Sequence, residues 1–140
     1  MFQDLKQYKL SWYYRKWKIE KDFQKELTRR LRADWYLVYH PQDVWLAYKF
    51  LDMHLVSPKW ELGWLELKKI QTDTFNVSKF EESQIFLMKE LDKRNPELCR
   101  VGIWSVKNND YVILRFSEIW NNKNEKGGIK LFWKNCYEWK

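Results

Sequence analysis

Apolar residues recur every three to four positions in two segments of this chain, which is the period of an amphipathic helix. In residues 16–33 the apolar positions are Trp17, Phe23, Leu27 and Leu31. In residues 76–94 they are Phe80, Ile85, Leu87, Met88 and Leu91. We therefore expect one helix early in the chain and a second helix after its midpoint.

Between these helices, apolar and polar residues alternate in two short runs, 52–56 and 64–68, as they do in strands. The runs are separated by residues 57–61, which include Pro58 and predict the turn of a β-hairpin. Two further strands are predicted at 101–106 and 111–116, on either side of a turn at 107–110. This order of helices and strands predicts an α/β fold.

The hairpin brings two carboxylates together. With its turn centred on Lys59, Asp52 lies almost directly across from Glu66, and Lys68 shares their face of the sheet. Two facing carboxylates repel each other and weaken a sheet. A divalent cation between them reverses this effect, since Mg²⁺ and Mn²⁺ prefer hard oxygen ligands. We expect Lys68 to hold or polarise a water molecule beside the metal.

The pattern Asp52…Glu66-Leu67-Lys68 resembles the signature of the PD-(D/E)xK nucleases. The resemblance implies a restriction-endonuclease-like αβββαβ core, with a central mixed β-sheet flanked by helices. It also implies that Asp52, Glu66 and the backbone carbonyl of Leu67 bind Mg²⁺, or Mn²⁺ as a substitute, and that water attacks a DNA phosphodiester. One departure is Leu51, which stands where many members carry proline.

The flanking helices extend the resemblance to Holliday junction resolvases of the RecU and Hjc kind. In these enzymes a glutamate on the first helix reaches the metal site, and Glu20 fits that pattern better than Glu26. A glutamine on the helix after Glu-x-Lys is also seen, and Gln84 occupies that place. The resemblance implies cleavage of branched or duplex DNA by a homodimer, because two symmetric cuts need two sites.

Composition is consistent with a nucleic-acid partner. The chain has 140 residues, which we interpret as a single nuclease domain, 1–140, with residues 1–15 as a possible N-terminal arm. Its 26 lysines and arginines against 19 acidic residues give a formal charge of +7, which favours DNA. No apolar run reaches transmembrane length and no signal peptide is recognised, so we expect an intracellular, cytoplasmic protein with no membrane partner.

Several residues are candidates for DNA contact because they are basic or lie beside the site. They are Arg15, Lys16, Arg29, Arg30, Arg32, Lys69 and Gln84. The interleaved aromatic and basic residues 11–18 suit stacked bases and bound phosphates, or alternatively an arm that packs on its own domain or on a second subunit. The arginines at the end of the first helix equally suit the negative end of a helix dipole.

Three other residues have less defined chemistry. His54 shares the strand face of Asp52, where it is either structural or an aid to proton transfer, and His40 lies in a turn with Asp43, a reserve metal ligand. Cys99 and Cys136 show no metal-ligand spacing, so both are expected to be reduced thiols.

Two alternatives to a resolvase stay open at the level of sequence. One is a sequence-specific restriction or homing endonuclease on the same core, which would recognise base edges. The other is a DNA-binding module that has kept the fold but does not cleave. Retention of Asp52, Glu66 and Lys68 speaks against this second alternative.

Overall fold

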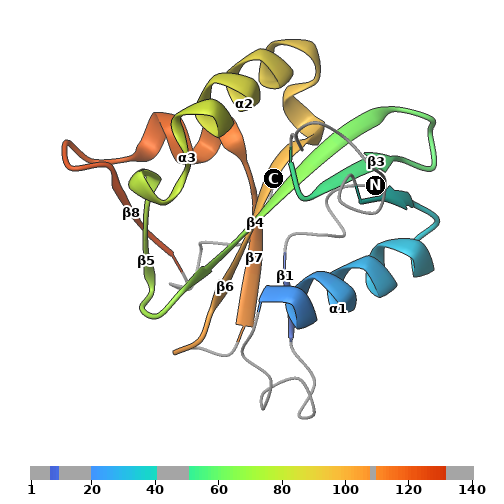
Figure 1. The fold of residues 1–140 in the computed structure, drawn as a ribbon, viewed down its shortest axis with the longest axis horizontal. Helices are drawn as coiled ribbons and strands as arrows, with labels where there is room; N and C mark the ends of the chain where they lie inside the picture. Colours follow the sequence, from blue (N-terminus) through green and yellow to red (C-terminus); the bar gives the residue numbers. More distant parts are fainter. Residues whose placement is uncertain (1–6, 10–19, 41–50, 108–109, 132–140) are drawn as a thin grey trace.

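The structure is a computed structural model that describes residues 7–9, 20–40, 51–107 and 110–131. It has an α/β architecture with a mixed central sheet, as predicted (Figure 1). In spatial order, the strands of this sheet are β1 (Gln7–Lys9), β7 (Asp110–Arg115), β6 (Cys99–Ser105), β4 (Leu62–Ile70), β3 (Met53–Val56) and β2 (Leu37–Tyr39). Strand β4 runs parallel to β6, whereas the other neighbouring strands are antiparallel.

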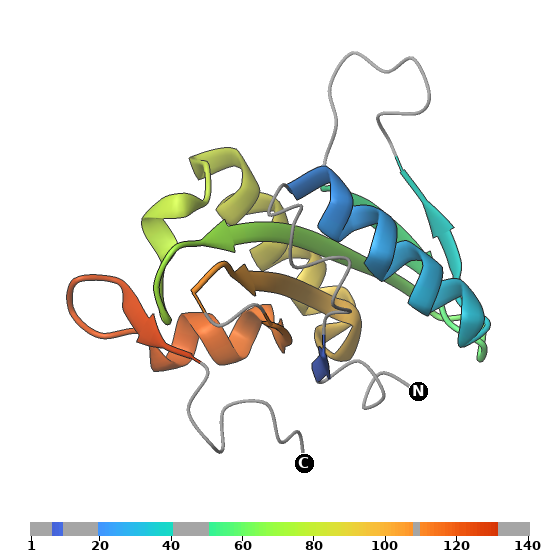
Figure 2. The same cartoon turned by 90° about the horizontal axis from the view of Figure 1, so that it is seen from below.

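Helix α1 (Glu20–Ala33) covers one face of the sheet and lies over the strands of the hairpin (Figure 2). Its apolar stripe of Phe23, Leu27 and Leu31 is fully buried against Met53, Leu55, Leu65 and Leu67. The predicted helical period is therefore confirmed, and the helix ends at Ala33 as expected. Residues 16–19 of the predicted helix lie outside the described residues.

A glycine allows α1 to approach the sheet closely. A Cβ atom at Gly102 of β6 would lie 2.9 Å from the Leu67 side chain and within 3.7 Å of Phe23 and Leu27. Any larger residue would have to displace this packing.

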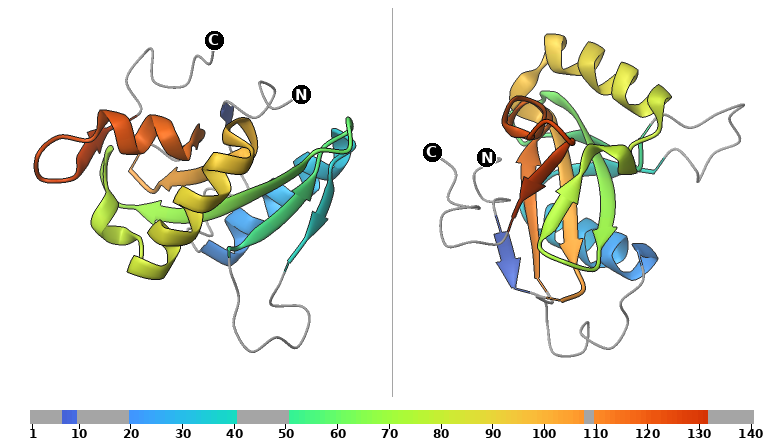
Figure 3. Two further views of the ribbon diagram at one scale, coloured as in Figure 1. Left: turned by 90° about the horizontal axis from the view of Figure 1, so that it is seen from above. Right: turned by 90° about the vertical axis from the view of Figure 1, so that its left-hand side faces the viewer.

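Helices α2 (Glu82–Arg94) and α3 (Phe116–Asn122) cover the opposite face (Figure 3). Met88 of α2 and Ile119 of α3 pack on the inward side chains of β6 and β7, including Val101 and Val112. A small second sheet, β5 (Thr74–Asn76) with β8 (Gly128–Lys130), lies beyond the end of β4. The crossover from β4 to β6 runs through α2, which explains why these two strands are parallel.

The predicted hairpin is confirmed with its register. Met53 pairs with Leu65 and Val56 pairs with Leu62, so the turn is centred on Lys59. The turn is closed by the Trp60 N–H, which donates to the Ser57 carbonyl at 2.8 Å, and by the Ser57 N–H, which donates to the Glu61 carbonyl at 2.9 Å. Strand β2, which was not predicted, adds a third antiparallel strand beside β3.

The predicted start of the second helix, Asn76, is wrong by six positions. Asn76 instead ends β5 and caps a 3-10 turn, η4 (Val77–Lys79), by accepting a 2.9 Å hydrogen bond from the Ser78 N–H. The backbone is then extended at Phe80, which buries its ring in the core beside Phe75 and Phe116. The predicted helix 76–94 was therefore too long, because the buried Phe80 has the spacing of a helical apolar residue although its backbone is extended.

The strands after α2 are shifted slightly from their predicted bounds. β6 begins at Cys99 instead of residue 101, and β7 ends at Arg115 because Phe116 begins the unpredicted helix α3. The Glu118 carboxylate accepts a 3.3 Å hydrogen bond from the Arg115 N–H, which stabilises the first turn of α3. Residues 108–109 of the predicted turn lie outside the described residues.

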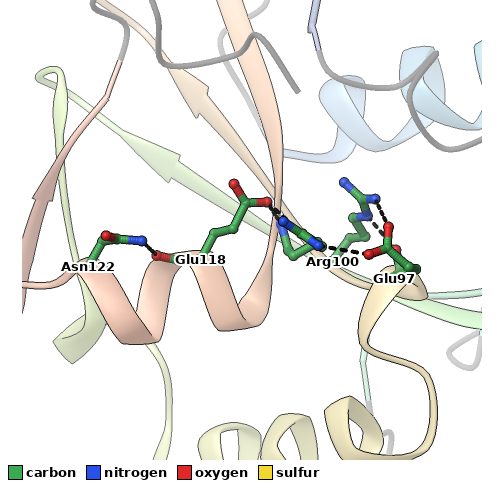
Figure 4. A network of polar contacts seen from close by, with 5 residues as sticks. Glu97, Arg100, Glu118 and Asn122 are labelled. Carbon is green, nitrogen blue, oxygen red and sulfur yellow. Dashed lines mark hydrogen bonds and ion pairs between the residues drawn. The ribbon is translucent and has the colours of Figure 1, made fainter. Parts of the chain in front are cut away.

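Two arginines share the carboxylate of Glu97 at the end of the sheet where β6 begins (Figure 4). Arg115 contacts Glu97 at 2.7 Å and Glu118 at 2.9 Å. Arg100 is almost fully buried, and its Nε donates to the Glu97 backbone carbonyl at 2.6 Å. Burial lowers the pKa of Arg100 to about 10, so its guanidinium stays charged at neutral pH and needs these acceptors.

Three further expectations concern the cysteines, the membrane and the N-terminal arm. Cys99 is a free, buried thiol, and burial raises its pKa to about 12, whereas Cys136 lies outside the described residues. Within the described ranges, none of the helices has the length and apolar character needed to cross a bilayer. Of the predicted N-terminal arm, residues 7–9 form β1 and pair with β7.

Candidate functional site

Asp52 and Glu66 meet where β3 begins, with reciprocal hydrogen bonds between their strands. The Asp52 N–H donates to Glu66 Oε1 at 3.2 Å, and the Leu67 N–H donates to Asp52 Oδ2 at 2.9 Å. The hairpin register therefore places the two carboxylates opposite each other, as predicted. Each carboxylate is held by a backbone group of the facing strand, so both are fixed in position.

Among the residues whose burial the structure describes, Glu66 is the one buried acidic side chain, with 3% of its surface exposed. Burial and, second to it, the nearby charge of Asp52 raise the pKa of its carboxyl from 4.5 to about 7. Lys68 and the Asp52 N–H oppose this shift without reversing it. A buried carboxyl that titrates near neutrality beside a second carboxylate is typical of a functional site.

Lys68 and Gln84 complete the cluster. Lys68 Nζ lies 3.4 Å from Glu66 Oε2 and donates to Gln84 Oε1 at 3.1 Å. Gln84 Nε2 in turn donates to Glu66 Oε2 at 2.7 Å. Gln84, which is 16 positions from Lys68 and 18 from Glu66 in sequence, thus closes a triangle of two hydrogen bonds and one ion pair.

The position of Gln84 follows from the way α2 begins. Gln84 Oε1 accepts a hydrogen bond from the Glu81 N–H at 3.0 Å, which is the backbone donor of the helix cap. The same amide oxygen therefore anchors the first turn of α2 and the Lys68 ammonium. Phe80, just before the cap, places its ring 5.7 Å from Lys68 Nζ. The sequence reasoning missed this contact because it assigned Phe80 to the apolar face of a longer helix.

The residues at this site fit a hard divalent cation. Two neighbouring carboxylates repel each other, and burial makes the ionised form of one of them less stable. A bound cation offsets both effects with its positive charge. The Leu67 N–H faces Asp52, and the carbonyl of a strand residue projects to the same side as its N–H. Mg²⁺ is commonly bound by one or two carboxylates with several waters retained. Within the described residues no group of three or more His, Cys, Asp or Glu side chains gathers.

Of the two glutamates considered for the first helix, Glu20 and Glu26, the structure describes the side-chain contacts of Glu26. Glu20 is the first residue of α1, and its side chain lies outside the described part of the structure. Glu26, the alternative, is bound by Arg29 at 3.0 Å and by Arg30 at 2.9 Å. Burial acts to raise the pKa of Glu26, but the hydrogen bonds from these arginines outweigh it and lower that pKa. Glu26 therefore belongs to an ion-pair cluster on α1.

The two histidines have different surroundings. His54 shares the face of Asp52 and packs against Tyr39 with 5.9 Å between ring centroids; burial lowers its pKa, which favours the neutral imidazole. His40 has defined partners, since its ring nitrogens lie 2.7 Å from Gln24 Nε2 and 3.2 Å from Thr28 Oγ1. Asp43, the reserve ligand, lies outside the described residues.

The predicted DNA contacts are dispersed over the molecule. Gln84 lies in the cluster, whereas Arg29 and Arg30 bind Glu26 and Arg32 donates to the Val38 carbonyl at 3.3 Å. Lys69 follows Lys68 along β4 and therefore lies on the opposite, α1 face of the sheet. Arg15 and Lys16 lie outside the described residues, as do the aromatic residues of 11–18.

Comparison with protein-family models and with curated proteins finds no match to this chain.

Proposed function

We propose that this protein is a Mg²⁺-dependent endodeoxyribonuclease of the PD-(D/E)xK type, most similar to Holliday junction resolvases. One observation carries the proposal: Asp52, Glu66, Lys68 and Gln84 meet at one point of the sheet through mutual hydrogen bonds. These are the four residue types that the sequence pattern assigns to one nuclease site. A surface ion pair would need neither the burial of Glu66 nor the amide bridge of Gln84.

The order of elements supports the proposal. From α1 to β6, leaving aside β5 of the small second sheet, the chain forms a helix, three antiparallel strands, a helix and a strand parallel to the third of them. This succession agrees with the αβββαβ order that the resemblance implies. The carboxylates lie at the start of β3 and within β4, where the resemblance expects them.

In the proposed mechanism, Asp52, Glu66 and the Leu67 carbonyl would hold Mg²⁺, or Mn²⁺ in its place, and Glu20 would support the ion directly or through water. When bound, the ion would supply positive charge beside the scissile phosphate and a coordinated water of lowered pKa. Within the described contacts, two of the three Lys68 N–H protons point to Gln84 and Glu66, which leaves the third for a water or a phosphate oxygen. Gln84 acts as a positioning residue because it orients both Lys68 and Glu66.

The partner proposed here is DNA, as the net charge of +7 favours a polyanion. A homodimer would supply two sites for symmetric cuts in a branched substrate. A DNA substrate would also place the protein inside the cell. Preference for linear duplex over junctions would favour the restriction or homing alternative, and binding without cleavage would favour the non-cleaving module.

The decisive experiment incubates the protein with a four-way junction, a linear duplex and single strands, in Mg²⁺, in Mn²⁺ and in EDTA. We expect cleavage of the junction with either metal and none in EDTA. Glu66→Gln should remove that cleavage while retaining DNA binding in Ca²⁺. Metal-independent cleavage, or wild-type cleavage by Glu66→Gln, would contradict the proposal.

A further inference from the structure

Large apolar side chains are exposed mainly at one end of the sheet. Among the described residues six are prominent on the surface, and five of them belong to β2, to the turn before it or to the β3–β4 hairpin. We call these five the tip surface: Trp35, Leu37, Tyr39, Trp60 and Leu62. Figures 1 and 3 show the hairpin turn and the start of β2 side by side at this end of the molecule.

The tip surface continues into the candidate site along one face of the sheet. Leu37, Val56 and Leu62 occupy one row across three strands, and Tyr39, His54 and Trp64 occupy the next row. The row after that contains Asp52 and Glu66. Leu62 and Glu66 are four residues apart on β4, a separation of about 13 Å along a strand.

The two tryptophans have a backbone conformation that the fold alone does not favour. Trp35 and Trp60 have φ angles of 70° and 65°, and their side chains are 82% and 79% exposed. Left-handed backbone is unfavourable for an L-residue, whereas glycine adopts it readily. Glycine at these turns would stabilise the fold more than an exposed indole does. Indoles at both turns therefore suggest a ligand-binding role.

We propose that the tip surface binds unpaired nucleobases, such as those at the point where the strands of a branched DNA part. Exposed rings recognise bases of any sequence by stacking. The row of Tyr39, His54 and Trp64 leads a strand from the tip toward the carboxylates. Cleavage of the bound strand rests on the proposed nuclease function, whereas binding of the strand to the tip surface does not.

Charge favours nucleic acid as the occupant over a second copy of this chain. The exposed Arg32 and Lys59 flank the tip surface beside Asp34 and Glu61, so the tip itself is close to neutral. Long-range attraction comes from the whole chain, whose charge of +7 draws a polyanion and repels another copy. The rings then recognise bases locally, and Lys68 contacts the backbone at the site.

The test measures binding of a fluorescent oligothymidylate and of a duplex of equal length in EDTA, where cleavage cannot occur. The variants are Trp60→Gly and Tyr39→Ala, with Trp60→Phe to restore a ring. Trp60→Gly relieves the left-handed backbone, so it should fold at least as well as the wild type. Phe86→Ala is the matched control, because Phe86 is 69% exposed but lies on α2, away from the tip.

We expect Trp60→Gly and Tyr39→Ala each to weaken oligothymidylate binding roughly 5- to 100-fold, as loss of a stacked base does. Duplex binding and the Phe86→Ala control should change little, and Trp60→Phe should recover most of the loss. Unchanged oligothymidylate binding in both variants would overturn the inference, as would wild-type protein that does not bind oligothymidylate. Dissociation of a dimer by Trp60→Gly, with binding unchanged, would assign the surface to a second copy instead. Since no metal is present, these results are independent of whether the protein cleaves DNA.

Discussion

Gln84 Nε2 donates a 2.7 Å hydrogen bond to the buried carboxylate of Glu66, although the two residues lie 18 positions apart in sequence. The helix that carries Gln84 begins where it does because the same amide accepts the Glu81 N–H. The Gln84 side chain thus both caps helix α2 and orients the candidate site. The site therefore cannot move independently of α2.

Removal of any member of the cluster should impair cleavage to a degree set by its role. Asp52→Asn, Glu66→Gln and Lys68→Ala should each lower the single-turnover rate by roughly 1,000-fold or more, because residues of such a site act as a unit. Gln84→Ala should lower it less, by roughly 10- to 100-fold, since a positioning residue acts through others. Lys69→Ala is the control, because it lies on the opposite face of β4 and should cleave like the wild type. Equal losses in Lys68→Ala and Lys69→Ala would contradict the assignment.

Divalent cations should stabilise the folded protein. Binding of Mg²⁺ or Mn²⁺ to the native state alone raises the free energy of unfolding by about 3 kcal/mol at a hundredfold excess over the dissociation constant. We expect the melting temperature to rise with metal in the wild type and to stay constant in Asp52→Asn with Glu66→Gln. Thermal melts with and without Mn²⁺ test this expectation. A rise of the same size in the double variant would locate the metal elsewhere.

The stability of the metal-free protein should fall as the pH rises through neutrality. The pKa of Glu66 is raised from 4.5 to about 7 in the folded state, so folding favours its protonated form. The resulting stability is fully present below pH 4.5 and is lost as the pH rises through 7, with a total change on the order of 3 kcal/mol. Denaturation in urea between pH 4.5 and 8.5 measures it.

Glu66→Gln should flatten this part of the pH profile, because an amide does not titrate. Glu90→Gln is a suitable control: Glu90 is paired with Lys93 on the surface of α2, and its replacement should leave the profile unchanged. A profile of Glu66→Gln that parallels the wild type would show that another group titrates.

The Glu97 carboxylate should be worth more to stability than an ordinary surface glutamate. Glu97→Ala removes the acceptor shared by Arg115 and the buried Arg100, and should lower the free energy of unfolding by about 1–3 kcal/mol. Glu90→Ala breaks only the exposed pair with Lys93 and should change the free energy of unfolding little. Equal effects of the two substitutions would mean that Arg100 is satisfied without the Glu97 carboxylate.

The sequence by itself determined the hairpin, its register and the pairing of Asp52 with Glu66. A strand alternates with period two, and a turn centred on Lys59 fixes every cross-strand pair, so local pattern was sufficient. The same holds for α1, whose buried stripe of Phe23, Leu27 and Leu31 follows the helical period.

Only the tertiary structure decided which distant side chains meet. The contact of Gln84 with Lys68 depends on where α2 begins, and the burial of Phe80 in extended backbone moved that start from Asn76 to Glu82. The burial that raises the pKa of Glu66 likewise depends on the packing around β4, the central strand. The helical period of apolar residues predicts which face of a helix is buried, but it does not predict the residue at which the helix begins. It also cannot distinguish an apolar residue in a helix from a buried apolar residue in extended backbone.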